Sequence, residues 1–359
     1  MLKFLIYQIY NGEKMKHTLS GIYHRLYTNK LLFKKEYLAK LSTSILGSQG
    51  VGKSNRKIEA VRKAFGENYE RGELFSWINV LKQSGVVTFF NNEFSFEQLP
   101  NFQLLIGDSN KDTSGVAAGS HSAMAIEHAF YEFIERQSFV YSFITRSAGM
   151  TLNYLVKESS DLELINKGNY YVNDISIVPN VSVVIFIYWT KKHFSMGLGC
   201  HKDQYEAFLK AFKEASGFGN HFFPNIEKED VLFTEFISKQ EVTRNIYTDY
   251  FEKHVSLKLL LKTYDYLKTA KPLKDWVVRH KTFSMDDFLI ASKHLNIPIS
   301  LQLLETASAM NFCKLVRVYS TEGFPSIDNT KIDPRNYNIS YYKDKNQSFP
   351  NEKKYLPFP

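Results

Sequence analysis

Acidic and basic residues recur at helical spacing in two parts of the chain. One Glu-x-x-Glu-Arg motif spans residues 67–71 and a second spans residues 132–136. Positions i, i+3 and i+4 lie on one face of a helix, so each copy would present two carboxylates beside a guanidinium. A single copy is typical of a solvated helix face that carries a weak ion pair. The recurrence favours a shared role in binding or catalysis.

A third segment repeats the layout of these two. Each helical run follows a Gly/Ser-rich turn, which is Gly47–Ser54, Gly115–Ser122 or Gly197–Gly199, and the third run reaches Glu214. Carboxylates gathered at one site repel each other unless a cation lies between them. Magnesium with a nucleoside triphosphate meets that need, because hard cations bind carboxylate and phosphate oxygens together. The residues therefore indicate a magnesium–nucleotide site.

Helices and strands with a clear hydrophobic period must position these residues. The period predicts helices over residues 55–82, 120–146 and 203–216, and mostly helix over 223–297. Strands are predicted in a hairpin at 86–96 that turns at Asn91-Asn92, at 171–178 and at 181–190. A third strand is expected to follow these two and to lead into Gly197, and two more are predicted at 298–303 and at 312–319. Residues 1–45 are expected to form a strand and then a helix. Because this order is not a regular βαβ repeat, the sequence predicts an α+β fold with helices layered on sheets.

The composition is that of an ordinary globular protein. The 359 residues, 44% hydrophobic and 23% charged, suffice for a sizeable core. The net charge of +8 favours acidic or phosphorylated partners, but the basic residues are spread out, so nucleic-acid binding is not predicted. Cys200 and Cys313 alone cannot build a disulfide framework, which suits a reducing cytoplasm. Val181–Trp189 is strongly apolar but too short to span a bilayer.

Residues 47–54 also match the phosphate-binding loop pattern G-x-x-x-x-G-K-S. That loop requires a buried apolar strand before it and a later strand that ends in an acidic residue for magnesium. Residues 36–46 are weak as a core strand, and no such acidic strand follows. A P-loop nucleotidase is therefore an alternative only, and Lys53 is a candidate phosphate contact in a different fold.

The motif segments resemble those of the YcaO family. Residues 115–138 are similar to the second signature of that family, residues 64–71 to its first, and residues 195–214 to its third. The ending Pro357-Phe358-Pro359 is similar to the proline-rich end of azoline-forming members, among which the microcin-type cyclodehydratases look most similar.

This resemblance implies a single YcaO-like domain over residues 1–359, with an N-terminal segment at 1–45 and an extended tail at 320–359. Its α+β fold would pack glutamate-bearing helices on mixed and antiparallel sheets around an ATP cleft. The implied enzyme is an ATP-dependent cyclodehydratase that converts Cys, Ser or Thr of a ribosomally made precursor peptide to thiazoline or oxazoline. The side chain attacks the preceding amide carbonyl, and phosphorylation turns the hemiorthoamide oxygen into a good leaving group.

The family pattern implies roles for individual residues of this sequence. Metal and phosphate binding falls to the motif glutamates, which are Glu67, Glu70, Glu132, Glu135 and Glu214. Further contacts to ATP are expected from Lys53, Ser54, Arg71, Arg136 and Arg317. The candidates for catalysis are Glu135, Arg136 and Pro359. Pro357 and Pro359 would place the C-terminal carboxylate in the active site as a base or positioning group.

The resemblance also implies cofactors and partners. ATP and Mg²⁺ are the expected cofactors. A precursor peptide, a separate leader-peptide-binding docking protein and a flavin-dependent azoline dehydrogenase are the expected partners in a cytoplasmic multi-subunit synthetase, with neither nucleic acid nor membrane involved. Lys63 and Gly217 depart from the family pattern, which leaves a non-catalytic scaffold subunit as an alternative. Thioamide or amidine formation is a further alternative within the same fold.

Overall fold

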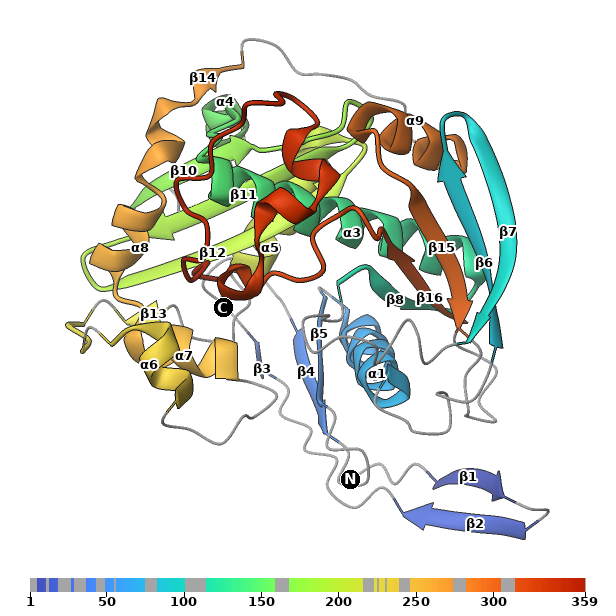
Figure 1. Ribbon diagram of the computed structural model, residues 1–359. Helices are drawn as coiled ribbons and strands as arrows, with labels where there is room; N and C mark the ends of the chain where they lie inside the picture. Colours follow the sequence, from blue (N-terminus) through green and yellow to red (C-terminus); the bar gives the residue numbers. More distant parts are fainter. Residues whose placement is uncertain are drawn as a thin grey trace. The chain divides into compact units, whose positions relative to one another are not determined.

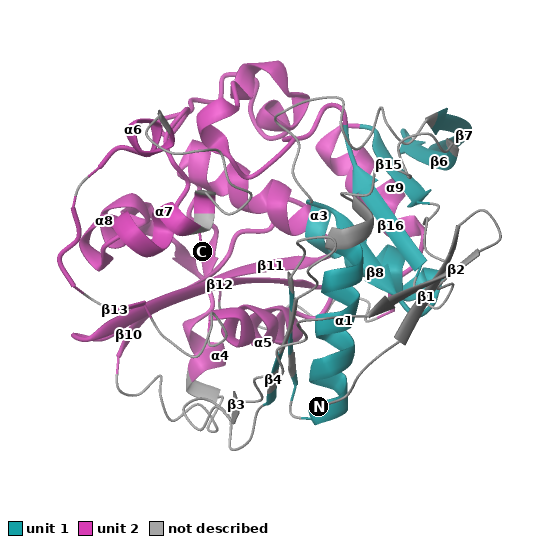
Figure 2. Ribbon diagram, turned by 90° about the horizontal axis from the view of Figure 1, so that it is seen from below, with its two compact units in different colours: residues 1–133, 298–320 teal, residues 134–297, 321–359 magenta. Residues whose placement is uncertain are grey.

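The computed structural model of the chain consists of two compact units (Figures 1 and 2). Unit 1 comprises residues 1–133 and 298–320, and unit 2 comprises residues 134–297 and 321–359. The structure describes residues 5–10, 13–18, 27–28, 37–42, 49–54, 56–74, 83–100, 114–158, 168–215, 223–224, 226–229, 231–238, 246–273, 282–304 and 314–358. No helix among these residues is long and apolar enough to cross a membrane.

The described residues of unit 1 form three antiparallel sheets. One is a two-stranded ribbon of β1 (Leu5–Tyr10) and β2 (Glu13–Thr18). A second has the order β3-β4-β5, from β3 (Tyr27–Thr28), β4 (Tyr37–Ser42) and β5 (Gln49–Ser54). The third has the order β7-β6-β15-β16-β8, from β6 (Gln83–Phe90), β7 (Glu93–Pro100), β8 (Val116–Gly119), β15 (Ile299–Leu304) and β16 (Lys314–Tyr319).

The β6–β7 hairpin confirms the expected pairing and turn. Phe90 pairs with Glu93, and the two residues between them, Asn91 and Asn92, both have positive φ angles, of 50° and 66°. Asparagine tolerates this left-handed conformation better than most residues, and two such residues form the tight turn that suits the twist of paired strands. The expected strands at 298–303 and 312–319 are confirmed as β15 and β16.

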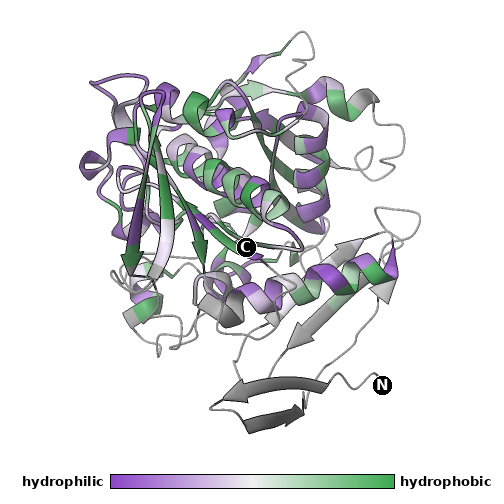
Figure 3. Cartoon of the chain, turned by 90° about the vertical axis from the view of Figure 1, so that its right-hand side faces the viewer, coloured by the Kyte–Doolittle hydropathy of each residue, from purple (hydrophilic) through white to green (hydrophobic). Residues whose placement is uncertain are grey.

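Helix α1 (Lys57–Leu74) covers the sheet of β4 and β5 in unit 1. Hydrophobic and hydrophilic residues alternate along this helix (Figure 3), as expected for a helix with one buried face. Ala60 and Ala64 are buried in that face and pack with Ala39 of β4. The helix lies so close to β5 that a Cβ placed on Gly52 would overlap the carbonyl oxygen of Ala60. Glycine is therefore required in the strand by the helix above it.

Unit 2 is built on a six-stranded sheet with the order β13-β12-β11-β10-β9-β14. Its strands are antiparallel except for the pair β9 and β14. They comprise β9 (Met150–Thr151), β10 (Asn169–Asp174), β11 (Ser182–Trp189), β12 (His193–His201), β13 (Phe223–Pro224) and β14 (Lys271–Pro272). Strand β11 is buried along almost its whole length, as its continuous apolar sequence predicts.

Helices cover this sheet and lead to the tail. Helix α3 (Ser122–Thr145) begins in unit 1 and ends in unit 2. The other helices of unit 2 are α4 (Asn153–Glu158), α5 (Gln204–Ala215), α6 (Phe233–Ser238), α7 (Ile246–His254), α8 (Leu257–Thr263), the 3₁₀ helix η3 (Asp265–Thr269) and α9 (Asp286–Leu295). The tail contains the 3₁₀ turns η4 (Asn329–Lys331), η5 (Pro334–Asn336) and η6 (Asn338–Tyr341).

The expected helices are confirmed, whereas the expected glycine-rich turns are wrong. Residues 49–54, 116–119 and 197–199 are strands or parts of strands, β5, β8 and β12. An extended strand cannot wrap a phosphate as a P-loop does, so the P-loop alternative is also wrong. Where the structure describes residues 1–45 it shows strands, so the helix expected there is wrong for those residues. The α+β fold with helices packed on mixed and antiparallel sheets is confirmed.

Candidate functional site

Helix α3 carries the second Glu-x-x-Glu-Arg motif in an apolar setting. The helix is buried on most sides, and Phe130, Ile134 and Phe139 are fully inaccessible to solvent. Glu135 and Arg136 are charged residues on this largely buried helix, and both are half-buried. A core helix normally excludes charge, because a buried ion needs a partner. Charged residues at this position therefore point to a role other than packing.

Two opposing effects act on the pKa of the Glu135 carboxyl. Burial raises its pKa above the ordinary value, because the charged form loses its hydration. The positive charges of Arg136 and Lys210 act in the opposite direction and offset part of this effect. Lys210 comes from α5, so two helices of unit 2 bring their charges into range of this one carboxyl. Its environment favours a cation or a proton at this position.

Glu214 is held by the backbone of the neighbouring strand. Its Oε2 atom accepts a hydrogen bond from the Leu198 N–H group at 2.6 Å. One turn earlier on α5, the Lys210 Nζ atom donates to the Cys200 carbonyl oxygen at 3.0 Å. The first contact orients the glutamate side chain toward β12, and the second joins the same helix to the same strand. A carboxylate can accept up to four hydrogen bonds, so a glutamate can bind a backbone N–H group and a metal ion or its water at the same time.

The tail reaches the motif arginine within unit 2. The Phe358 ring lies 5.2 Å from the Arg136 guanidinium carbon and packs edge-on against Phe139, with ring centroids 5.2 Å apart. Phe358 is 3% exposed. The proline-rich ending is therefore packed against the helix that carries the second motif. The general tendency of chain ends to fray does not apply to this segment.

Unit 1 holds the remaining motif glutamates. Glu67 and Glu70 are half-buried on α1, and Glu132 is half-buried on the first part of α3. The Ser54 hydroxyl accepts the Arg56 N–H group at 3.2 Å, next to the start of α1. It therefore contributes to the local structure at the start of this helix. Arg317 is buried on β16, with its guanidinium carbon 5.7 Å from the Tyr319 ring centroid. The side chains of Lys53 and Arg71, and the whole of Pro359, lie outside the described residues.

The structure shows that two strand–helix pairs are built on one plan. A Cβ on Gly50 would overlap the carbonyl oxygen of Ala64, and a Cβ on Gly197 would overlap that of Ala211. The same register continues along both helices. The matching residues are Gly52 and Gly199, Glu59 and Glu206, Ala60 and Ala207, Lys63 and Lys210, Phe65 and Phe212, and Glu67 and Glu214.

Lys210 is a residue that the sequence analysis missed. The signal that could have found it is this internal correspondence, which places a lysine one turn before the motif glutamate in both helices. In the same register Gly217 stands where α1 has Glu70, so the third segment carries one glutamate instead of two. Gly217 itself lies outside the described residues.

The donor set fits magnesium with a nucleotide better than a metal ion alone. Among the described residues, no three Asp, Glu, His or Cys side chains are close enough to hold a metal ion by themselves. Magnesium usually keeps several waters and is bound by one or two carboxylates together with substrate phosphates. Half-buried glutamates, one of them fixed by a backbone N–H group, match this mode of binding. Glu135 and Glu214 would hold such an ion, and Arg136 would contact phosphate.

Three solved structures share this fold. A chain of the E. coli microcin synthetase McbBCD complex has a TM-score of 0.63 and 14% identity, with 100% of both chains covered. YcaO from Methanopyrus kandleri, bound with AMPPCP and Mg²⁺, has a TM-score of 0.59 and 15% identity over 84% of this chain and 85% of its own. A heterocyclase in complex with substrate and cofactor has a TM-score of 0.58 and 15% identity, over 94% of this chain and 55% of its own.

Sequence comparison adds the family. A search of curated proteins finds no match. The family model described as YcaO cyclodehydratase, ATP- and Mg²⁺-binding, matches residues 97–286, which is more than half of the chain. This match confirms the resemblance seen in the motif segments and the expected cofactors, ATP and Mg²⁺. The chain belongs to the YcaO family of cyclodehydratases.

Proposed function

We propose that this protein is an ATP-dependent peptide cyclodehydratase that converts Cys, Ser or Thr residues of a ribosomally made precursor peptide to thiazoline or oxazoline. The observation that carries the proposal is the contact of Phe358, in the Pro-Phe-Pro ending, with Arg136 of the second motif. This contact joins the family motif to the proline-rich ending, and the resemblance associates that ending with azoline formation. Family membership supports the dependence on ATP and Mg²⁺.

The residues divide into metal-binding, phosphate-binding and tail groups. Glu67, Glu70, Glu132, Glu135 and Glu214 bind magnesium and its waters, with Glu214 oriented by the Leu198 N–H group. Phosphate oxygens are bound by Arg71, Arg136 and Arg317, with Lys53 and Ser54 as further contacts. Bound ATP supplies a phosphoryl group that turns the former amide oxygen into a leaving group.

The remaining chemistry is proton transfer and positioning by the protein. A hydroxyl or thiol must lose a proton as it attacks the amide carbonyl, so a base is needed beside the reacting atoms. We assign this role to the C-terminal carboxylate of Pro359, which would accept the proton. Glu135 and Arg136 lie in the same part of unit 2 and neutralise charge that develops during the reaction.

We further propose that both units form one functional YcaO domain, with residues 1–45 and 320–359 as its N-terminal segment and tail. The enzyme would act in the cytoplasm within a multi-subunit synthetase. A docking protein would deliver the leader part of the precursor, and a flavin-dependent dehydrogenase would oxidise the rings. The E. coli microcin synthetase match is to a chain of a complex, which supports an assembly of this kind.

Intact mass of a precursor peptide tests the proposal. A candidate peptide encoded beside this gene is co-expressed with the chain and the neighbouring proteins. We expect the loss of one water per modified Cys, Ser or Thr, and the loss of two further hydrogens per ring when the dehydrogenase is present. Glu135→Gln should abolish the change, whereas Glu127→Gln, on the same helix, should leave it intact.

The mass also separates the alternatives. A scaffold subunit would leave the peptide unchanged although every partner is present. Thioamide formation would raise the mass by the difference between sulfur and oxygen, without loss of water. Water loss that persists in Glu135→Gln would contradict the role given to this glutamate.

A further inference from the structure

The last residues of the tail are held by two tyrosine hydroxyl groups. The Tyr247 hydroxyl donates to the Leu356 carbonyl oxygen, and the Tyr264 hydroxyl donates to the Pro357 carbonyl oxygen at 2.6 Å. These acceptors belong to successive residues of the chain. Leu356 is fully buried, so its carbonyl group has to find a partner within the protein.

The sequence of the tail explains why side chains must supply these donors. Proline has no N–H group, so an extended segment that reads Leu-Pro-Phe-Pro has one edge without backbone donors and cannot pair with a strand along that edge. Its carbonyl groups can still accept hydrogen bonds. Two phenols at fixed positions can therefore hold the segment at a defined place along its length.

Both phenols are themselves rigidly placed. Tyr264 ends α8, is fully buried and stacks on Phe139 of α3, with ring centroids 6.4 Å apart. Tyr247 lies on α7, and its own carbonyl oxygen accepts the Tyr355 hydroxyl at 3.1 Å, so tail and helix bind each other in both directions. Burial raises the pKa of Tyr247 and Tyr264 well above the ordinary value for a phenol, so both remain donors at neutral pH.

We propose that Tyr247 and Tyr264 form a clamp that positions the end of the tail against Arg136, and that turnover depends on this clamp. The dependence of turnover rests on the proposed function above. The clamp places Phe358 against both Phe139 and the Arg136 guanidinium, which limits where the following residue can go. The two tyrosines are positioning residues, because they contact the tail and act through it.

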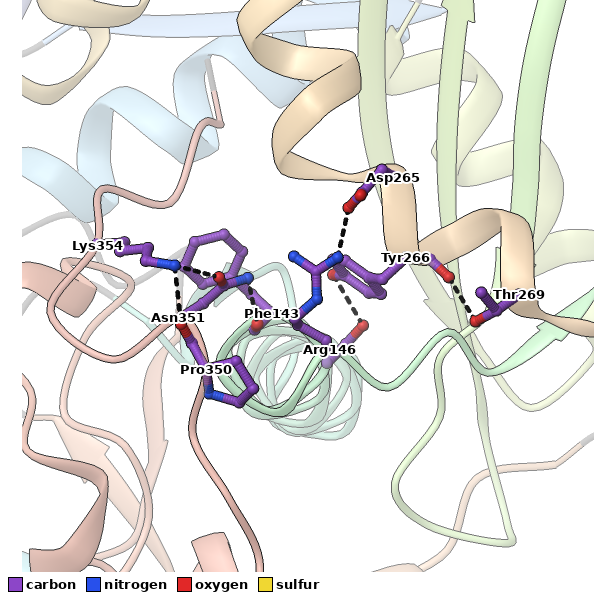
Figure 4. Close-up of polar contacts among 9 residues, drawn as sticks. Phe143, Arg146, Asp265, Tyr266, Thr269, Pro350, Asn351 and Lys354 are labelled. Atoms are coloured by element: carbon purple, nitrogen blue, oxygen red, sulfur yellow. Dashed lines mark hydrogen bonds and ion pairs between the residues drawn. The ribbon is translucent and has the colours of Figure 1, made fainter.

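The rest of the tail has separate anchors, which makes the clamp testable. In Figure 4, Asn351 contacts the end of α3, where its Nδ2 atom donates to the Phe143 carbonyl oxygen at 3.0 Å. Its backbone N–H group donates to the Ile144 carbonyl oxygen at 3.3 Å. Within the tail itself, Lys354 Nζ donates to the Pro350 carbonyl oxygen at 2.8 Å, which stabilises the turn that Asn351 anchors. Removal of one phenol should therefore loosen only the residues after 354.

Hydrogen exchange of the full chain tests the clamp without any activity. The variants are Tyr247→Phe and Tyr264→Phe, with Tyr266→Phe as the matched control. Tyr266 is also a buried phenol, but its hydroxyl is within hydrogen-bonding distance of Ser142, at 3.2 Å, rather than the tail. We expect the Leu356 and Phe358 amides to exchange about five- to tenfold faster in the first two variants, as the loss of one hydrogen bond predicts, and at the wild-type rate in the control. Equal exchange in all four proteins would overturn the clamp.

Ring formation then tests whether the clamp matters for turnover. We expect Tyr264→Phe to lower the rate of water loss from the precursor several-fold while Mg–ATP affinity stays unchanged. In a chain shortened by residues 357–359, the same substitution should have no further effect, because the clamp has nothing to hold. Additive effects of the two changes would overturn the positioning role. If the wild-type chain forms no ring, the proposed function fails, whereas the exchange experiment still decides whether the clamp exists.

Discussion

The strand–helix pairs β5–α1 in unit 1 and β12–α5 in unit 2 share one plan but lie in different surroundings. Each places two glycines of a strand under the alanines of the following helix and ends on a half-buried glutamate. Strand β12 lies between β11 and β13 in a six-stranded sheet, whereas β5 is at the edge of a three-stranded one. The glycine contact therefore fixes the helix in both pairs, and the depth of the surrounding core differs.

The matched lysines show what this difference does to charge. Lys63 is exposed on α1, whereas Lys210 is half-buried and hydrogen-bonded to the Cys200 carbonyl oxygen. Within unit 2, Lys210 lies close enough to Glu135 to lower its pKa. The lysine of α5 is therefore part of the charged surroundings of Glu135 in unit 2. The packing of helix on strand thus determines the positions of the glutamates, and the neighbouring charges and burial determine their pKa values.

The largest expected loss of stability comes from adding a side chain to a strand glycine that contacts the helix. Gly199→Val should destabilise the protein by at least about 3 kcal/mol, because its side chain overlaps backbone atoms of Ala207 that cannot move without displacing α5. Gly52→Val makes the same change at the edge of a smaller sheet and should cost less. Denaturant unfolding of both variants measures the difference. Equal losses would show that the depth of the core does not matter at this contact.

Glu214→Gln should have a smaller effect on stability. The amide keeps an acceptor for the Leu198 N–H group but loses the charge that strengthens this hydrogen bond, which predicts a loss of about 1 kcal/mol. The control is Glu206→Gln, an exposed residue on the first turn of the same helix, which should change stability by less than about 0.5 kcal/mol. Thermal unfolding without nucleotide is the measurement. A control as damaging as Glu214→Gln would show that the backbone contact is not the cause.

Glu135→Gln should stabilise the ligand-free protein, in contrast to Glu214→Gln. Because burial raises the pKa of Glu135 in the folded state, its ionisation costs stability as the pH rises through the raised value. Below about pH 4 the carboxyl is protonated in both states, so the benefit of glutamine should vanish there. The gain should be small, since Arg136 and Lys210 already offset part of the cost. A lower midpoint of thermal unfolding at pH 7 would contradict this account of the site.

Gly66→Ala should give the smallest change and have the opposite sign to the other glycine substitutions. Gly66 lies inside α1, and a Cβ at this position meets no atom within 4 Å. Alanine costs less conformational entropy in a helix, so stability should rise by about 0.5–1 kcal/mol. The same unfolding assay serves here. A loss of stability would show that the packing of α1 differs from the structure.

Local sequence signals predicted much of the fold. The positive φ angles at Asn91 and Asn92 suit the turn that these residues predict, and hydrophobic periods located α1, α3 and α5. Strand β5 was not predicted as a strand, because Gly50 and Gly52 carry no side chains that indicate one and because its sequence matches a phosphate loop. Its strand role depends on α1, which lies close above it, and no local pattern reveals that contact.

The candidate site was predicted in part, for a related reason. The motif glutamates could be named because their spacing repeats along the chain. Lys210 of α5 acts on Glu135 of α3, far away in sequence, and Tyr264 binds Pro357 from 93 positions away in sequence. Both are long-range contacts that only the folded chain creates.

Calorimetry of the full-length chain with Mg–ATP tests most directly the proposal that the motif glutamates Glu67 and Glu214 each contribute to nucleotide binding. We predict that Glu67→Gln and Glu214→Gln each weaken binding by more than about tenfold. Glu59→Gln and Glu206→Gln, which change the other matched pair of glutamates, should bind as the wild type does. Unchanged affinity in the first two variants, or equal losses in all four, would contradict the account.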